Sequence, residues 1–144
     1  MTDRPPLARP VEMGDADAEL LAEAQDLLAR VYRRGRHEVA AAFRIEDGAV
    51  VTGVHVDGSA RRSAVCAEGV AAGNAVAHGG GRVIAAVSVL RRPGGTEHVI
   101  EPCGVCAEML SDYWPGARVW VTRGELIVVS TMSDLLPAKR RREW

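Results

Sequence analysis

The chain has 144 residues, a length that suits one domain. Apolar residues make up 47% of it, enough for a hydrophobic core, so a chain that is disordered throughout is excluded. The formal charge of −1 gives no general reason to expect nucleic acid as a partner. We find neither a secretory signal nor an apolar run long enough to span a membrane, and therefore expect a cytoplasmic protein.

The first half of the chain predicts an arm, a helix and a β-hairpin. Residues 1–14 contain three prolines and are expected to form a loose arm. Apolar residues then recur at helical spacing, with Asp15 or Asp17 as the expected N-cap and Gly35 as the stop. The pair Asp47-Gly48, between two apolar runs, is typical of a hairpin turn.

The second half alternates predicted helices with predicted strands. The continuous apolar run over 83–90 is typical of a buried central strand. The other expected elements, in chain order, are a helix that follows Cys66 and stops after His78, a turn at 91–98, a helix that follows Cys103 and stops at Pro115-Gly116, strands near 117–122 and 125–130, and a short helix at 132–136.

This alternation predicts a three-layer α/β/α sandwich around a mixed sheet of about five strands. A single domain is expected over residues 15–137. Residues 138–144 form a basic tail, and a run of charges at a chain end is usually solvated.

All three cysteines of the chain lie at the starts of predicted helices: Cys66 before one, Cys103 and Cys106 at the next. Helix N-termini favour thiolates, and a spacing of two residues lets both sulfurs of a CxxC reach one ion. Three thiolates suit zinc and leave its fourth position open, as in catalytic sites. Glu68 lies two residues beyond Cys66, where a carboxylate can move protons.

Other interpretations of these residues stay open at this point. The thiol and the carboxylate can be a buried Cys66 and a solvated Glu68. The zinc can be structural and closed by a histidine, or Cys103 and Cys106 can form a thioredoxin-like redox pair.

The segments "CAE" (66–68) and "PCGVC" (102–106), with "DLLP" (134–137), resemble the small zinc-dependent cytidine deaminases and the related blasticidin S deaminases. The resemblance covers most of the chain. It implies Cys66, Cys103 and Cys106 as zinc ligands and Glu68 as the proton shuttle. The implied reaction is hydrolytic attack at C4 of a cytosine ring, in which Glu68 passes protons to N3 and to the departing ammonia.

The resemblance also implies substrate contacts from the segment before Cys66 and from the chain end. His55 and Asp57 stand where the family has its ribose-binding Asn and Glu, and His37 stands in place of a Phe near the base. Ala67, between the ligand and the shuttle, and the C-terminal Trp144 are further candidates.

Arg61 and Arg62 are departures from the family pattern. Two arginines near a pocket can bind a phosphate or a carboxylate, or offset the negative charge of three thiolates, or lie on a solvated loop. The offset matters because the family often has an arginine after the glutamate or after the last cysteine, where this chain has Gly69 and Ala107. Glu101, before Pro102, either rims the pocket or is solvated.

We therefore expect a hydrolase that acts on a free cytosine nucleoside, as a homo-oligomer (a tetramer or dimer), without nucleic-acid or membrane partners. A nucleoside antibiotic such as blasticidin S, or a nucleotide, is the alternative substrate. A nucleic-acid editing enzyme and a non-catalytic zinc protein are further alternatives; few aromatics argue against the first and Glu68 against the second.

Overall fold

The computed structural model describes residues 3–143, which fold around one mixed sheet. The helices are α1 (Asp15–Val31), α2 (Ala67–His78) and α3 (Gly104–Tyr113), with short 3₁₀ helices at Arg61–Ser63 and Met132–Leu135. The strands are β1 (Val39–Ile45), β2 (Val50–Val54), β3 (Val83–Arg91), β4 (Glu97–Val99), β5 (Arg118–Arg123) and β6 (Leu126–Thr131).

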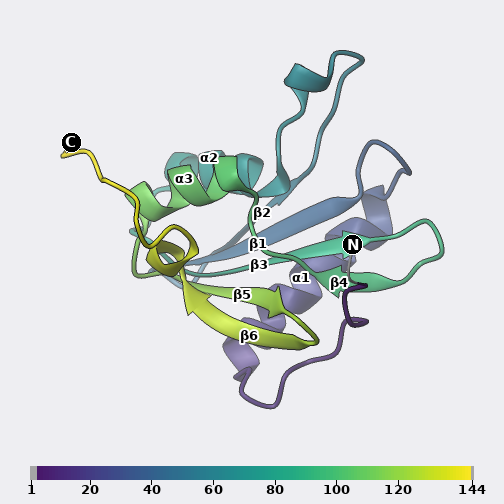
Figure 1. The fold of residues 1–144 in the computed structure, drawn as a ribbon, viewed down its shortest axis with the longest axis horizontal. Coiled ribbons are helices and arrows are strands. Elements are labelled where there is room, and N and C mark those ends of the chain that lie inside the picture. The colour runs from purple at the N-terminus through teal and green to yellow at the C-terminus, as the bar shows by residue number, and fades with distance from the viewer. Residues whose placement is uncertain (1–2, 144) are drawn as a thin grey trace.

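The sheet has the order β2-β1-β3-β5-β6, and β4 pairs with the end of β3. The β3–β5 pair is parallel and the other pairs are antiparallel. The helices α2 and α3 lie together over one face, and α1 covers the other (Figure 1). The five expected strands, the central place of β3 and the three layers are confirmed.

The two faces of the sheet bury separate hydrophobic cores, as the alternation of side chains along a strand requires. In β1, Ala41 and Phe43 pack toward α2 and α3, whereas Ala40 and Ala42 pack toward α1. The apolar stripe of α1 supplies the second core. A helix layer on each side thus explains why β1 and β3 are apolar at almost every position.

The first turn of α2 lies close to the sheet because a row of small residues faces it. Ala41 of β1 pairs with Gly53 on one side and with Ser88 on the other. A Cβ at Gly53 would lie 2.4 Å from both the carbonyl oxygen of Ala67 and the backbone nitrogen of Ala71, which no real side chain tolerates. Glycine at 53 therefore sets how deeply the start of α2 sits.

The structure differs from two sequence expectations where the N-terminal arm meets β4. Residues 91–98 are not only a turn, because Glu97 and His98 belong to β4, and His98 is buried rather than on a loop. The described part of the arm is not loose: Met13 is buried, and the Leu7 backbone N–H donates to the Glu97 carbonyl at 2.7 Å.

The basic tail is also less solvated than expected. Lys139 packs against α3, where its Nζ lies 2.9 Å from Asp112 Oδ1 and donates to Ser111 Oγ at 3.0 Å. Its side chain is 8% exposed, so this part of the tail is anchored. Trp144 lies outside the described residues, as do residues 1 and 2. No helix in the described chain is both long and apolar enough to cross a bilayer.

Asp17 joins α1 to β5 instead of capping the helix, whose N-cap is Gly14. Its carboxylate accepts hydrogen bonds from Arg118 Nη2 at 2.8 Å and from Trp120 Nε1 at 2.9 Å. Burial opposes ionisation of Asp17, but the hydrogen bonds from Arg118 and Trp120 hold the pKa of its carboxyl below the ordinary value.

Replacement of Asp17 by alanine is expected to lower the free energy of unfolding by about 2 kcal/mol at neutral pH, because both donors lose a charged acceptor. A carboxyl with a lowered pKa contributes fully above its ordinary range, near pH 4, and loses this contribution as the pH falls through its folded-state pKa. Urea unfolding of the wild type and Asp17→Ala should therefore differ at pH 7 and converge in acid. Asp26→Ala, at an exposed position of α1, is the control. Equal stability of wild type and Asp17→Ala at pH 7 would contradict this role.

Candidate metal and catalytic site

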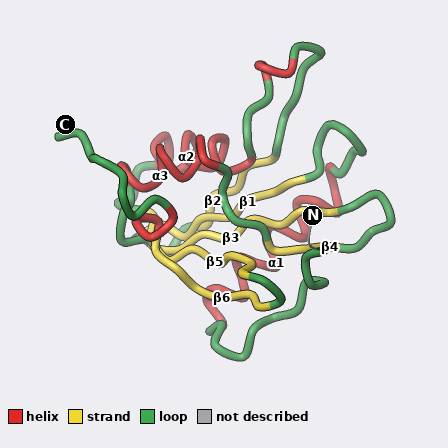
Figure 2. Tube along the Cα trace, in the orientation of Figure 1, coloured by secondary structure: helices red, strands yellow, loops and turns green. Residues whose placement is uncertain are grey.

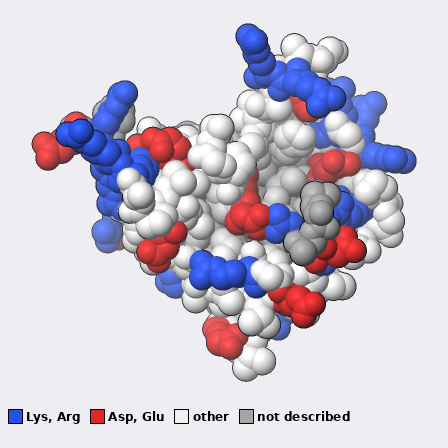
Figure 3. Space-filling view, in the orientation of Figure 1, with Lys and Arg blue, Asp and Glu red and all other residues white. Residues whose placement is uncertain are grey.

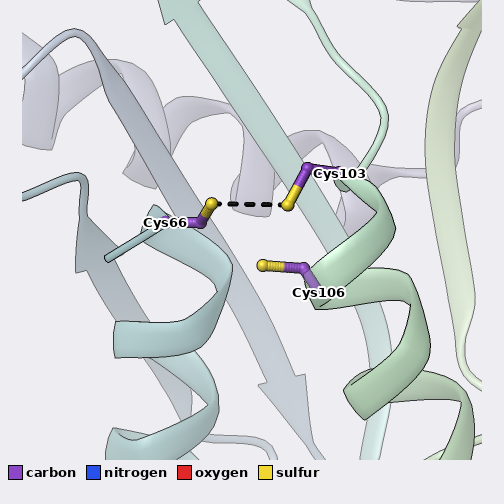
Figure 4. A group of neighbouring side chains, drawn as sticks. All are labelled: Cys66, Cys103 and Cys106. Atoms are coloured by element: carbon purple, nitrogen blue, oxygen red, sulfur yellow. Dashed lines mark hydrogen bonds between the residues drawn. The ribbon is translucent and has the colours of Figure 1, made fainter. Parts of the chain in front are cut away.

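The three cysteines meet between the starts of α2 and α3. Cys66 is the N-cap of α2, Cys103 is the N-cap of α3, and Cys106 lies one turn into α3. Their sulfurs all lie within 4.8 Å of one another, and the sulfurs of Cys66 and Cys103 are 3.4 Å apart. Figure 4 shows the three side chains pointing toward a common point between the two helices.

This spacing fits one tetrahedral ion. With metal–sulfur bonds of about 2.3 Å, ligands at tetrahedral angles lie about 3.8 Å apart. Among the described residues no histidine belongs to this group, so the arrangement supplies three ligands and leaves a fourth position open. A closed site with a histidine ligand is not the geometry that these side chains form.

The thiols differ in how readily they ionise. Burial raises the pKa of Cys103, but hydrogen bonds from the backbone N–H groups of Cys106 and Val105 and from the thiols of Cys66 and Cys106 together outweigh burial and hold it below the ordinary value. Burial raises the pKa of Cys66, and burial followed by the nearby Glu68 carboxylate raises the pKa of Cys106 strongly. A divalent cation is the group that would let all three ionise together, since it offsets their mutual repulsion.

Glu68 lies beside this cluster in the first turn of α2. It is 3% exposed, and its Oε2 is 4.0 Å from Cys106 Sγ. Burial raises the pKa of Glu68, against the opposing effect of a hydrogen bond from the Ser88 hydroxyl of β3. A buried carboxyl with a raised pKa is suited to accept and return a proton near neutral pH.

A pocket of about 210 Å³ opens next to the cluster. It lies at the end of the sheet where β1 begins and β2 ends, between the starts of α2 and α3. Its lining includes both polar and apolar side chains: Val39, His55, Cys66, Ala67, Glu68, Ile100, Glu101 and Cys103. In the space-filling view the face that carries the N-terminal arm is hollowed near its centre (Figure 3).

Of the residues expected to contact substrate, His55 belongs to the pocket lining, whereas His37 and Asp57 do not, although both lie next to His55. The Nδ1 of His37 is 2.9 Å from the His55 carbonyl oxygen. His55 Nε2 lies 3.9 Å from Asp57 Oδ2. The other carboxylate oxygen of Asp57 is buried and accepts no hydrogen bond from the described residues.

The other expected contacts are placed differently. Ala67 lines the pocket, but Arg61 and Arg62 are exposed and are not part of its lining. These arginines lie on the 3₁₀ helix of a long loop that rises away from the body, seen above α2 in Figure 2. Trp144, the remaining candidate, lies outside the described residues.

Sequence reasoning missed Ser88 and Arg4. Ser88 was detectable in principle, because it is the one polar residue in the apolar run 83–90. Arg4 carries no local signal, although both of its terminal nitrogens donate to the carboxylate of Glu101 at the pocket's edge. Glu101 therefore rims the pocket, the first of the two roles considered for it.

Comparison with known proteins identifies this kind of site. Residues 15–122 match the model of the cytidine and deoxycytidylate deaminase zinc-binding region. The chain belongs to this family, whose members are aminohydrolases, and the sulfur cluster of Cys66, Cys103 and Cys106 is consistent with its zinc site.

The individual proteins that resemble this chain in sequence or structure are also named deaminases. A blasticidin-S deaminase of Bacillus cereus is 34% identical over 131 residues, which cover 88% of this chain and 93% of that protein. A cytidine deaminase of Halalkalibacterium halodurans is 31% identical over 105 residues, or 71% of this chain and 76% of that protein. The crystal structure of the Bacillus anthracis cytidine deaminase superposes with a TM-score of 0.75 at 25% identity, covering 87% of this chain and 89% of that one. The cytidine deaminase-like fold is thereby confirmed.

Proposed function

We propose that this chain hydrolyses the amino group at C4 of the cytosine ring in a free nucleoside or nucleoside-like compound. The products are the uracil form and ammonia. The observation that carries the proposal is a buried carboxylate, Glu68, that lines a small pocket beside three convergent cysteine sulfurs. Hydrolytic deamination needs both parts: a Lewis acid to activate water and a nearby group to move protons.

Zinc held by Cys66, Cys103 and Cys106 would supply the Lewis acid. Glu68 takes the proton that water loses and delivers it to N3 of the ring. It then takes the proton of the hydroxyl group added at C4 and passes it to the amino nitrogen, which leaves as ammonia when the C4–N bond breaks. The Ser88 hydroxyl of β3 favours the charged form of Glu68 and so opposes the rise in its pKa that burial causes. Burial of Glu68 keeps bulk water from competing for these protons.

The size of the pocket favours a pyrimidine ring over a whole nucleoside. Its volume of about 210 Å³ is below the roughly 300 Å³ at which pockets for drug-sized ligands begin. The sugar would then lie at the mouth, beside His55 and Asp57. His55 lines the pocket and its Nε2 lies 3.9 Å from Asp57 Oδ2, which supports a contact between His55 and a sugar hydroxyl there.

A nucleoside antibiotic is a second candidate substrate. The observation that favours it is the blasticidin-S deaminase relative, which matches more of this chain than the cytidine deaminase of H. halodurans does.

An anionic cytosine compound is a third candidate, favoured by charge on three neighbouring loops. The loops 32–38, 55–65 and 91–97 carry seven arginines against three carboxylates, in a chain of net charge −1. The three loops contact one another through His37 and His55 and through the Arg91 backbone N–H, which donates to the Glu38 carbonyl. Six of the arginines are exposed and make no ion pair with any described residue: Arg33, Arg34, Arg36, Arg61, Arg62 and Arg92. Lys and Arg side chains, in blue, gather at the upper right of the molecule in Figure 3.

We also infer that copies of the chain associate through the face formed by α2 and α3. An apolar groove runs between these helices, lined by small residues and by Val76, Met109 and Tyr113. Val76 and Tyr113 are both 59% exposed, and Val105 on the same helix pair is 79% exposed. Large apolar side chains gathered on one face are typical of a protein contact.

Glu68→Gln should abolish turnover while the fold and the zinc remain. The amide has the size of the carboxylate but cannot carry the proton, so ammonia release should fall by at least about 100-fold. Metal content and melting temperature should match the wild type, as should all properties of the control Glu23→Gln, at an exposed position of α1. A Glu68→Gln variant with more than a tenth of wild-type turnover would contradict the mechanism.

A substrate comparison separates the three candidates. Ammonia release should be measured with cytidine, deoxycytidine, cytidine monophosphate and blasticidin S. We expect the nucleosides to have the highest kcat/KM. A preference for the monophosphate that disappears in an Arg61→Ala, Arg62→Ala double variant would establish the anionic candidate instead. A preference for blasticidin S would establish the second.

The oligomer is tested by light scattering. The mass of the wild-type particle should be at least twice the 15.4 kDa of one chain. Val76→Glu should reduce the mass toward that of one chain, because a charge cannot be buried in an apolar contact. Glu23→Gln again serves as the control. A wild-type monomer would contradict the inference.

A further inference from the structure

We propose that Arg4 positions Glu101 as a hydrogen-bond acceptor for the part of the substrate attached to the cytosine ring. The inference rests on the proposed function and adds a specificity determinant to it. Arg4 is a positioning residue in this account, because it acts on the substrate through Glu101.

The contact between the two residues is specific in geometry. Arg4 Nη1 donates to Glu101 Oε2 at 2.6 Å, and Arg4 Nη2 donates to Oε1. Such a two-pronged pair fixes the plane of the carboxylate, which a lysine could not do. Both side chains are shielded in part, with exposures of 30% and 40%, so the pair is screened less than a fully exposed one.

The N-terminal arm is held on the course that brings Arg4 to this place. The Nδ1 of buried His98 is 2.8 Å from the Pro5 carbonyl oxygen, and the Leu7 backbone N–H donates to the Glu97 carbonyl. Glu97 is held in turn by Arg91 Nη2 at 2.6 Å. The arm thus runs beside β4 and reaches the pocket's edge with Arg4.

Glu101 faces the pocket that Glu68 and Cys103 also line. A free carboxylate at this edge would repel thiolates and Glu68, but the guanidinium of Arg4 offsets its charge. Each carboxylate oxygen has two acceptor sites, so the bond from Arg4 leaves acceptor capacity on both oxygens. A hydroxyl or amino group on the substrate can use this capacity.

The position of the pair decides which part of the substrate it contacts. Glu101 and Glu68 both line the pocket, but the Glu101 side chain is 40% exposed and Glu68 is 3% exposed, so Glu101 lies nearer to the solvent-facing mouth. Glu68 must face the amino group and N3 of the ring. The group attached to the ring, rather than the ring, therefore meets Glu101.

Steady-state kinetics with the preferred cytosine compound tests the proposal. Arg4→Ala and Glu101→Gln should each raise KM by about tenfold and leave kcat within about twofold, since the lost contact is uniform binding. Arg4→Lys should restore part of the loss. The double variant should be no worse than either single variant, because the two residues act as one unit.

The matched control is Arg82→Ala, which breaks a similar arginine–glutamate pair with Glu46 on the surface away from the pocket. Its KM should be that of the wild type. If Arg4→Ala changes the melting temperature but not KM, the pair only stabilises the fold and the proposal is wrong. If the effects of the two single variants on KM multiply, the two residues act independently and the positioning role is wrong.

Calorimetric binding of cytidine and of blasticidin S to the Glu68→Gln protein, with and without Arg4→Ala, separates this proposal from the proposed function. A Kd about tenfold higher with Arg4→Ala supports the positioning role. An equal Kd overturns that role and leaves the deaminase function intact. Failure of both compounds to bind either protein overturns both proposals together.

Discussion

The site depends on how closely the first turn of α2 approaches the sheet. The row Gly53, Ala41 and Ser88 offers no bulky side chain, and a Cβ at Gly53 would collide with the α2 backbone. This close approach places Glu68 against Ser88 and brings Cys66 level with the start of α3. A larger residue in the row would move the carboxylate and one ligand together, away from the other two cysteines.

Two opposed electrostatic requirements meet in the same small volume. The helix starts stabilise negative charge, which favours thiolate at Cys103 in particular. Burial acts in the other direction on Glu68, and burial together with mutual repulsion does so on Cys66 and Cys106. The cluster is therefore built for a cation at its centre and for a carboxyl beside it that gains and loses a proton easily.

The residues around the pocket's mouth distinguish this chain. Gly69 and Ala107, which follow Glu68 and the last cysteine, carry no charge, whereas several arginines lie on the outer loops and Arg4 lies in the arm. Arg4 is bound to Glu101 at the rim, while Arg61 and Arg62 lie on an outer loop and have no carboxylate partner within residues 3–143. Under the proposed function, these residues would meet the group attached to the base.

Features that depend on a short segment of sequence could be predicted, whereas contacts between residues far apart in the sequence could not. The layers followed from periodicity, and the ligand set followed from cysteines at two helix starts. Arg4 and Glu101 are 97 residues apart, and Asp17 and Trp120 are 103 apart, so no local pattern links them. Strand β4 has only three residues, too short for a period to appear beside the glycines that precede it. Lys139 looked like part of a solvated charge run because its partners on α3 become neighbours only in the folded chain.

Zinc held by the three cysteine sulfurs would have its fourth position facing the pocket, since Cys66 and Cys103 belong to the pocket lining. X-ray absorption at the zinc edge of the metal-loaded protein measures this coordination. The account predicts three sulfur neighbours at about 2.3 Å and one lighter oxygen-type neighbour that exchanges with added ligands. A spectrum with a histidine nitrogen as the fourth neighbour, or with fewer than three sulfurs, would contradict it.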